Sequence, residues 1–187
     1  MSYFPAFLDL SHKKILIIGG GFIAYEKLRH MLDFSLNISI VALHISKDVQ
    51  KLINTHNLTH DEKAYEVGDI KGFDMVIVAT DDISLQKSIY YESKNLNNCL
   101  VNSVDSVGYC DFIFPSYIKK GDLTIAVSTS GSSPAFAKLF KIYISKLIPN
   151  DIGKFLEKMK NFRNSMPKGE NRMKFLDKKA KEYIDEI

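Results

Sequence analysis

The sequence has no tryptophan, five prolines and only two cysteines among 187 residues. Cys99 and Cys110 are too few for a disulfide framework, and their spacing matches no metal-binding pattern. Free cysteines of this kind are usually buried and inert, so we expect both thiols to lie in the interior. Low cysteine usage is typical of a reducing compartment, and we expect a cytoplasmic protein.

Long apolar runs and an excess of one charge are also missing. No run approaches the roughly 20 apolar residues of a membrane helix. The segment MSYFPAFLDLSHKK lacks a basic stretch before an apolar core, so we expect no signal peptide. Residues 1–150 contain 15 basic and 15 acidic side chains, and residues 151–187 contain 10 and 7. This mixed tail is unlike a nucleic-acid-binding arm, and we expect neither a nucleic acid nor a membrane as partner.

The remaining composition, 45% hydrophobic and 25% charged, suits a globular protein with a sizeable core. Short apolar runs alternate with amphipathic segments in the first part of the chain. We predict strands over residues 14–18, 37–43, 64–67, 75–79 and 99–104. We predict helices over residues 24–34, 48–55 and 84–95. This alternation indicates an α/β fold with a Rossmann-like, doubly wound parallel sheet.

The pattern changes after residue 111. We predict strands over 112–117 and 123–128, joined by a turn at Gly121 and Asp122. Ser133 and Pro134 then open a helix as N-cap and first helical residue. That helix is heavily apolar, so we expect it to be buried, against a partner chain. Two amphipathic helices follow, separated by Pro167 and Gly169. We therefore divide the chain into a nucleotide-binding domain (1–112), a dimerisation and substrate segment (113–149) and a C-terminal helical region (150–187).

The stretch Gly19-Gly20-Gly21-Phe22-Ile23-Ala24 fits the pattern G-x-G-x-x-A between a strand and a helix. In this pattern Gly19 permits a tight turn, and Gly21 allows the backbone to approach a pyrophosphate. Ala24 lets the helix pack close to the strand. The helix N-terminus beginning at Phe22 and Ile23 favours the phosphate charge. The alternative is a merely structural turn, but the context favours dinucleotide binding.

One residue that is usual in such a site is missing. A carboxylate about 20 residues after the glycines ordinarily holds the ribose hydroxyls of NAD. Here the second strand ends in Leu43 and His44, whose backbone or imidazole we expect to hold the ribose. No arginine is present to receive a 2′-phosphate, which favours NAD over NADP. Thr80 and Asp81 end another strand and are candidates for the same pocket, while Asp82 caps the next helix.

Two further groups suggest chemistry. Asp105 follows a strand at the carboxyl edge, where a carboxylate can act as a general base, although it can also cap a turn before Gly108. Hydroxyl groups cluster just before the helix that begins at Pro134. Hydroxyls and free N–H groups in this position suit carboxylate binding, although a polar capping loop is the alternative. The candidates are Ser128, Thr129, Ser130 and Ser132.

Histidines offer no convincing metal site. His56 and His60 are spaced as two ligands on one helix face, but the residues between them are poor helix formers and no third ligand is near. We expect a solvated loop there and no bound metal.

Taken together, seven segments resemble the precorrin-2 dehydrogenase family, which forms the dehydrogenase and sometimes ferrochelatase part of siroheme synthases. These segments are PAFLDL (5–10), GGGFIA (19–24), ATDD (79–82), VNSVD (101–105), CDFIFPS (110–116), GDLTIAVSTSGSSPAFAK (121–138) and IP (148–149). The resemblance implies oxidation of precorrin-2 to sirohydrochlorin, with NAD⁺ as hydride acceptor and the matching Asp105 in catalysis. It also implies a homodimer.

Some members of that family also insert Fe²⁺ into the product, and the resemblance leaves this activity open here. The sequence reads Ala42-Leu43-His44 where many members read A-P-E, and its C-terminal region is short. We expect no appended methyltransferase domain. Two other interpretations stay open: an NAD(H)-binding sensor without catalysis, and a dehydrogenase for another small polyanion.

Overall fold

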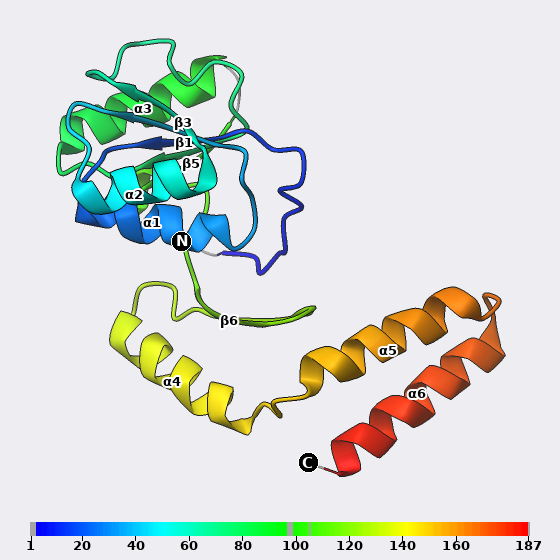
Figure 1. The fold of residues 1–187 in the computed structure, drawn as a ribbon. Helices are drawn as coiled ribbons and strands as arrows, with labels where there is room; N and C mark the ends of the chain where they lie inside the picture. Colours follow the sequence, from blue (N-terminus) through cyan, green and yellow to red (C-terminus); the bar gives the residue numbers. More distant parts are fainter. Residues whose placement is uncertain (1–2, 97–98, 105, 187) are drawn as a thin grey trace. The chain divides into compact units, whose positions relative to one another are not determined.

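A computed structural model describes residues 3–96, 99–104 and 106–186 (Figure 1). The chain forms two compact units, one from Tyr3 to Ile113 and the other from Phe114 onward. The first unit holds a five-stranded sheet in the order β3-β2-β1-β4-β5, in which every neighbouring pair is parallel. Its strands are β1 (Ile15–Ile18), β2 (Ile38–Ala42), β3 (Thr59–Glu62), β4 (Met75–Val78) and β5 (Leu100–Ser103). The predicted α/β class is confirmed.

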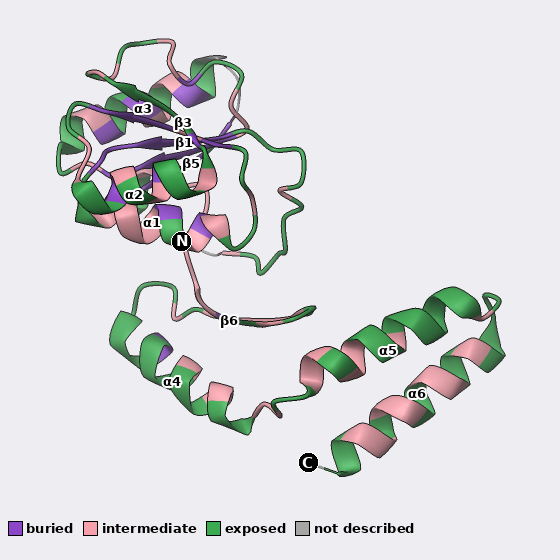
Figure 2. Cartoon of the chain, viewed as in Figure 1, coloured by how far each residue is buried: buried purple, intermediate pink, exposed green. Residues whose placement is uncertain are grey.

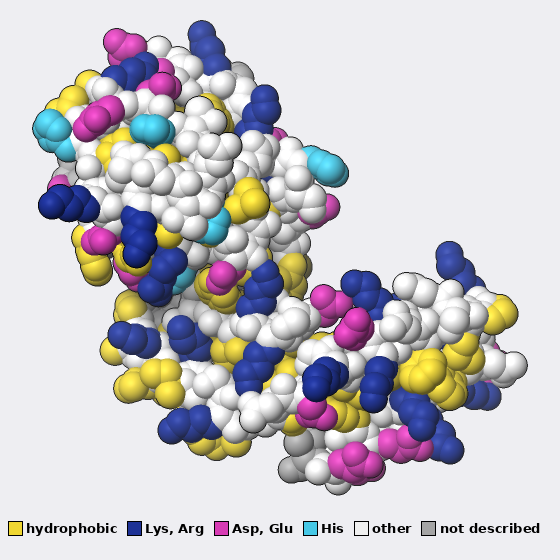
Figure 3. Space-filling view, viewed as in Figure 1, with side chains coloured by type: hydrophobic (Ala, Val, Ile, Leu, Met, Phe, Trp, Pro, Cys, Tyr) yellow, Lys and Arg dark blue, Asp and Glu magenta, His cyan; other side chains and the backbone are white. Residues whose placement is uncertain are grey.

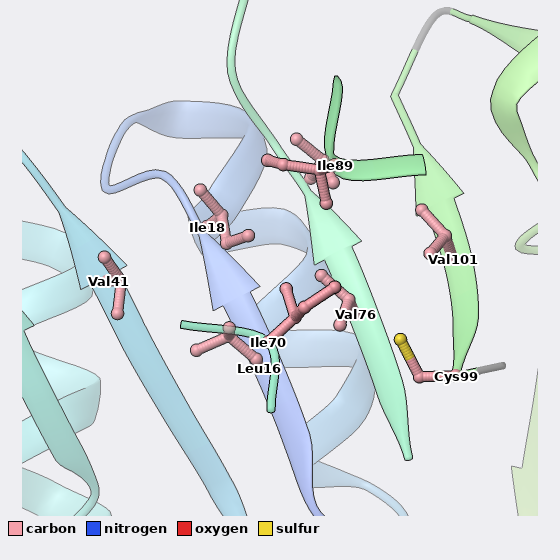
Figure 4. Packing of buried hydrophobic residues seen from close by; sticks show 9 residues of the cluster. Leu16, Ile18, Val41, Ile70, Val76, Ile89, Cys99 and Val101 are labelled. Atoms are coloured by element: carbon pink, nitrogen blue, oxygen red, sulfur yellow. The ribbon is translucent and has the colours of Figure 1, made fainter. Parts of the chain in front are cut away.

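Helices cover both faces of this sheet. Helices α1 (Phe22–Leu32) and α2 (Lys47–His56) pack against each other on one face, and α3 (Ile83–Leu96) covers the other (Figure 1). The central strands β1 and β4 are buried at every residue, as Figure 2 shows, because both faces are covered. Ile89 of α3 packs into the cluster that contains Val76, Val78 and Val101 (Figure 4).

The predicted strand over residues 64–67 is wrong. The third strand along the chain is β3, which lies earlier in the sequence, at Thr59–Glu62. All four residues of β3 are exposed. This edge strand is held by its backbone pairing with β2. Its sequence, THDE, has no apolar alternation that would predict a strand. Tyr65, from the predicted strand, instead packs against the core, and its hydroxyl donates to Glu92 at 2.7 Å.

The expected loop around the two histidines is also wrong. His56 is the last residue of α2, and His60 lies in β3. Between them, Asn57 adopts the left-handed conformation that ends the helix. Within the described parts of the chain, no three His, Cys, Asp or Glu side chains are placed to hold a metal ion.

The second unit begins with an antiparallel hairpin of β6 (Ser116–Lys120) and β7 (Leu123–Val127), joined by the predicted turn. The first of these strands starts four residues later than residue 112, where the sequence placed it. Three helices follow: α4 (Pro134–Leu147), α5 (Ile152–Ser165) and α6 (Glu170–Asp185). Helices α5 and α6 pair through two aromatic contacts, Phe155 with Tyr183 and Phe162 with Phe175.

Helix α4, which we expect to be buried against a partner chain, is not covered by the described residues of its own chain. Ala137 is its only buried residue, and its apolar side chains are largely exposed (Figure 2). The cysteines also differ from expectation: Cys99 is buried, but Cys110 is only partly so. None of the described helices is long and apolar enough to cross a lipid bilayer.

Candidate dinucleotide site

The glycine turn lies at the point where the order of the strands in the sheet reverses. From β1 the chain continues outward through β2 and β3, and it then returns to the other side of β1 as β4 and β5. In open parallel sheets, ligands bind at the carboxyl ends of the strands at such a switch point. Residues 19–21 occupy this place, between the ends of β2 and β4.

Gly19 and Gly20 are enclosed by backbone from both sides. Gly19 has φ +122°, and a Cβ added there would lie 2.3 Å from the carbonyl oxygen of Ala79. A Cβ on Gly20 would lie 2.2 Å from the carbonyl oxygen of His44. No side chain fits in either position. The pattern G-x-G-x-x-A explains Gly19 but leaves Gly20 unspecified, so sequence reasoning missed the need for a glycine there.

Gly21, in contrast, is open. A Cβ added to it would meet no atom within 4 Å among the described residues, and its φ of −87° is ordinary. Gly21 is the N-cap of α1, and no side chain caps this helix. The free N–H groups of the first turn therefore face an uncrowded glycine, as anion binding at a helix N-terminus requires.

The other members of the predicted motif surround this opening. Ala24 is buried, with only 1% of its surface exposed, so its small side chain lets α1 approach the sheet. Ile23 is partly buried, whereas Phe22 is 76% exposed at the start of the helix. These residues fit a dinucleotide: a tight turn, an open glycine and an uncapped helix end occur together.

The loop after β2 lies directly on the glycine turn. The backbone N–H of Ser46 donates to the carbonyl oxygen of Gly20 at 2.9 Å, and the His44 carbonyl faces the same glycine. The side chains of Leu43 and His44 are exposed beside it. This contact brings both predicted ribose residues to the cofactor turn, with no carboxylate between Ala42 and Lys47.

The segment after β4 borders the turn from the other side. The backbone N–H of Ala79 donates to the carbonyl oxygen of Ile18 at 2.7 Å. Thr80 is partly buried with its hydroxyl oxygen inside, and Asp81 is exposed, so the side chain of Asp81 is the one presented at this edge. Asp82 directly precedes α3, and its carboxylate accepts from the N–H of Leu85 at 3.1 Å and from the Ser84 hydroxyl. These bonds lower the pKa of Asp82 and confirm its capping role.

The predicted base Asp105 lies outside the described residues, but the segments that flank it are firmly held. The Cys110 thiol accepts from the Ser103 N–H at 3.3 Å and donates to the Ser103 carbonyl at 3.1 Å. Burial raises the pKa of this thiol, so it stays protonated at neutral pH. Asp111 accepts from the Val101 N–H at 2.8 Å and pairs with Lys94 at 2.5 Å. The motif CDFIFP therefore fastens the chain after β5 back onto β5 and α3.

In the second unit, the predicted hydroxyl cluster forms a tight loop before α4. The Ser128 hydroxyl accepts from the Ser130 N–H at 3.1 Å, and the Thr129 hydroxyl accepts from the Ser133 N–H at 3.0 Å. Ser133 caps α4 as predicted, accepting from Phe136 N–H at 3.2 Å. Ser130 has φ +51°, in the left-handed region. Ser128, Ser130 and Ser132 are exposed, and each hydroxyl can still donate to a ligand.

Comparisons with known proteins agree with this site. Residues 6–116 match the family described as "Putative NAD(P)-binding", and residues 120–142 match "Sirohaem biosynthesis protein central". A siroheme synthase from Ruthia magnifica is 36% identical over 166 residues, which cover 89% of this chain and 35% of that protein. A siroheme synthase from Photobacterium profundum is 32% identical over 168 residues, covering 90% and 36%. The chain thus spans about a third of the length of these curated relatives.

A solved structure has the same fold. SirC, a precorrin-2 dehydrogenase, superposes with a TM-score of 0.80 at 22% identity, over 94% of this chain and 88% of that one. The family match covers the sheet, the glycine turn and both loops that border it. The chain therefore belongs to this NAD(P)-binding family, and siroheme synthases are its relatives, as the motifs of its sequence implied.

Proposed function

We propose that this chain catalyses the NAD-dependent dehydrogenation of precorrin-2 to sirohydrochlorin. The observation that carries the proposal is the opening at Gly21, bordered by the closed positions Gly19 and Gly20. The siroheme synthase relatives and the SirC fold support the choice of a tetrapyrrole as substrate. Bound NAD⁺ would supply the hydride acceptor.

Residues of the chain then have separate tasks. The backbone at Gly19 and Gly21 and the first turn of α1, from Phe22 to Ala24, would hold the pyrophosphate. Leu43 and His44 would contact the ribose through their exposed positions beside Gly20, and Thr80 and Asp81 would border the pocket after β4. NAD is favoured over NADP because no arginine stands after β2 to bind a 2′-phosphate.

Dehydrogenation also releases a proton, which a base must accept. Asp105 is the proposed base, because it comes two residues after β5 in the sequence, ligands of such sheets bind beyond the carboxyl ends of the strands, and a carboxylate is a suitable acceptor. Four residues, Ser128, Thr129, Ser130 and Ser132, would donate hydrogen bonds to the carboxylates of the tetrapyrrole. Insertion of Fe²⁺ into the product is a second step that the relatives' name, siroheme synthase, makes worth testing.

An anaerobic assay with purified protein, precorrin-2 and NAD⁺ tests the proposal. We expect NADH to appear together with the sirohydrochlorin spectrum. Asp105→Asn should abolish this activity while NAD⁺ binding persists, whereas Asp61→Asn, on the exposed edge strand β3, should behave as wild type. Binding of NAD⁺ without NADH formation would instead favour the sensor interpretation. Turnover with a different polyanion, and none with precorrin-2, would favour a dehydrogenase for another small polyanion.

A further inference from the structure

One buried glutamine links α3 to the edge of the cofactor site. Gln86 lies near the start of α3 and is 2% exposed. Its side-chain Nε2 donates to the backbone carbonyl oxygen of Thr80 at 2.7 Å. Its backbone N–H donates to the carbonyl oxygen of Asp82 at 3.0 Å. The same residue therefore holds both ends of the short turn from Thr80 to Asp82.

The residue before this turn is in direct contact with the glycine motif. Ala79, the residue before Thr80, closes on Gly19 through its carbonyl oxygen and bonds to Ile18 through its N–H. The hydrogen bond from Gln86 holds the carbonyl end of Thr80, the residue that directly follows Ala79. Gln86 therefore fixes the backbone of Thr80, the first residue of the segment that borders the glycine turn after β4.

Gln86 keeps this role at a cost to stability. Its Oε1 atom is buried and has no hydrogen-bond partner among the described residues, and the same holds for Thr80 Oγ1 and Ser103 Oγ. Buried acceptors without partners are unfavourable. Ile89, one turn further along α3, packs on the same sheet face against Val78 and Val101. An apolar residue at position 86 would continue that packing and remove the unpaired Oε1, although it would also take away the donor to the Thr80 carbonyl.

We propose that Gln86 is a positioning residue for the dinucleotide site, which it serves by holding the Thr80 carbonyl. The inference rests on the proposed function, because it assumes that the turn borders a bound dinucleotide. It explains why a polar side chain occupies a buried position that packing alone would fill with an apolar one. Stability given up for a functional geometry is a common compromise at binding sites.

The test is the variant Gln86→Met, which keeps the length of the side chain and its helix propensity but removes the donor. We expect the dissociation constant for NAD⁺ to rise about tenfold or more, a change that calorimetry resolves. We expect the thermal midpoint to change little, because the variant removes the unpaired Oε1 of Gln86 but leaves the Thr80 carbonyl without its donor. Amide hydrogen exchange should become faster in the peptide covering residues 79–85 and stay unchanged in the rest of α3.

The matched control is Gln50→Met on α2. The carboxamide of Gln50 donates to Asn54 at 2.9 Å on the surface, so this variant should bind NAD⁺ as wild type does. If Gln86→Met does not fold, Gln86→Leu, a shorter apolar side chain without a donor, should show the same loss of affinity.

Two results would overturn the inference and leave the proposed function intact. One is a Gln86→Met protein with wild-type affinity for NAD⁺. The other is a joint fall of affinity and thermal midpoint, with faster exchange throughout α3, because that would indicate a purely structural role. Absence of NAD⁺ binding by the wild-type protein itself would overturn the proposed function, and the inference with it.

Discussion

At the scale of single residues, the three adjacent glycines are required for different reasons. Gly19 needs a positive φ and lies against the Ala79 carbonyl, and Gly20 lies against the His44 carbonyl. Gly21 has neither constraint, since its surroundings are open and its φ is ordinary. Stability therefore depends on the first two, whereas ligand access depends on the third.

Alanine at Gly19 and at Gly21 should separate these roles. Gly19→Ala should destabilise the fold by about 3 kcal/mol or more, because the Cβ meets backbone in a strained conformation. Gly21→Ala should change stability by less than about 0.5 kcal/mol. It should nevertheless weaken NAD⁺ binding by about tenfold or more, because the methyl group occupies the approach to the turn. Urea unfolding and calorimetry measure the two effects, and a stable Gly19→Ala protein would contradict this account.

His44 offers a test of cofactor choice. Aspartate at this position would accept hydrogen bonds from the ribose hydroxyls of NAD⁺ and repel the 2′-phosphate of NADP⁺. His44→Asp should therefore shift the ratio of the two dissociation constants by about tenfold or more in favour of NAD⁺. His60→Asp, with the same charge change on exposed β3, is the control. Equal effects on both cofactors would show that His44 does not face the ribose.

At the scale of elements, polar side chains hold the ends of strands, where the hydrogen bonds between neighbouring strands stop. Cys110 and Asp111 tie the segment after β5 to the strand, as described above. At the opposite edge, Asp74 precedes β4 and accepts from the backbone N–H of Lys14 at 2.9 Å and from Lys13 Nζ at 2.9 Å. Asp74 therefore joins the beginnings of the two central strands.

The Asp74 contact predicts a dependence of stability on pH. The backbone bond from Lys14, followed by the bond from Lys13, lowers the pKa of Asp74 below its ordinary value. An unfolded aspartate titrates near pKa about 3.9, so this contribution is present above that pH and is lost as the pH falls through the lower folded pKa. The free energy of unfolding of Asp74→Asn should fall less steeply on acidification than that of wild type. Parallel acid slopes in urea titrations would refute this.

At the scale of the whole molecule, α4 carries apolar side chains that the described residues leave exposed. Five exposed apolar side chains recur at helical spacing. The rings of Phe136 and Phe140 stack with their centroids 5.5 Å apart. They are Phe136, Leu139, Phe140, Tyr143 and Leu147. Apolar and basic side chains alternate over α4 in Figure 3. Since patches of this kind usually mark an interface, we propose that the chain forms a homodimer and that α4 lies in its interface.

A double variant tests this surface. Leu139→Asp combined with Tyr143→Asp should turn a dimer into a monomer at the same concentration in analytical ultracentrifugation. Both side chains are more than half exposed in the protomer, so its thermal midpoint should change little apart from the loss of dimerisation. Lys138→Asp, on the opposite side of α4, should remain dimeric. A wild-type monomer, or a dimeric double variant, would place the interface elsewhere.

The sequence by itself determined those features that have local causes. Buried strands such as Ile15–Ile18 are continuous apolar runs, the glycine turn has a required spacing, and Ser133 with Pro134 marks a helix start, so each was predictable. The motifs also pointed to the correct family. Only the tertiary structure decided what depends on neighbours distant in sequence.

The exposed strand β3 exists because β2 offers it a backbone edge, and Gly20 must be glycine because the His44 carbonyl lies against it. Gln86 reaches Thr80 only because α3 folds back over the end of β4. Such contacts leave no periodic trace in the sequence, because each is set by geometry between segments and not by the order of residues within one.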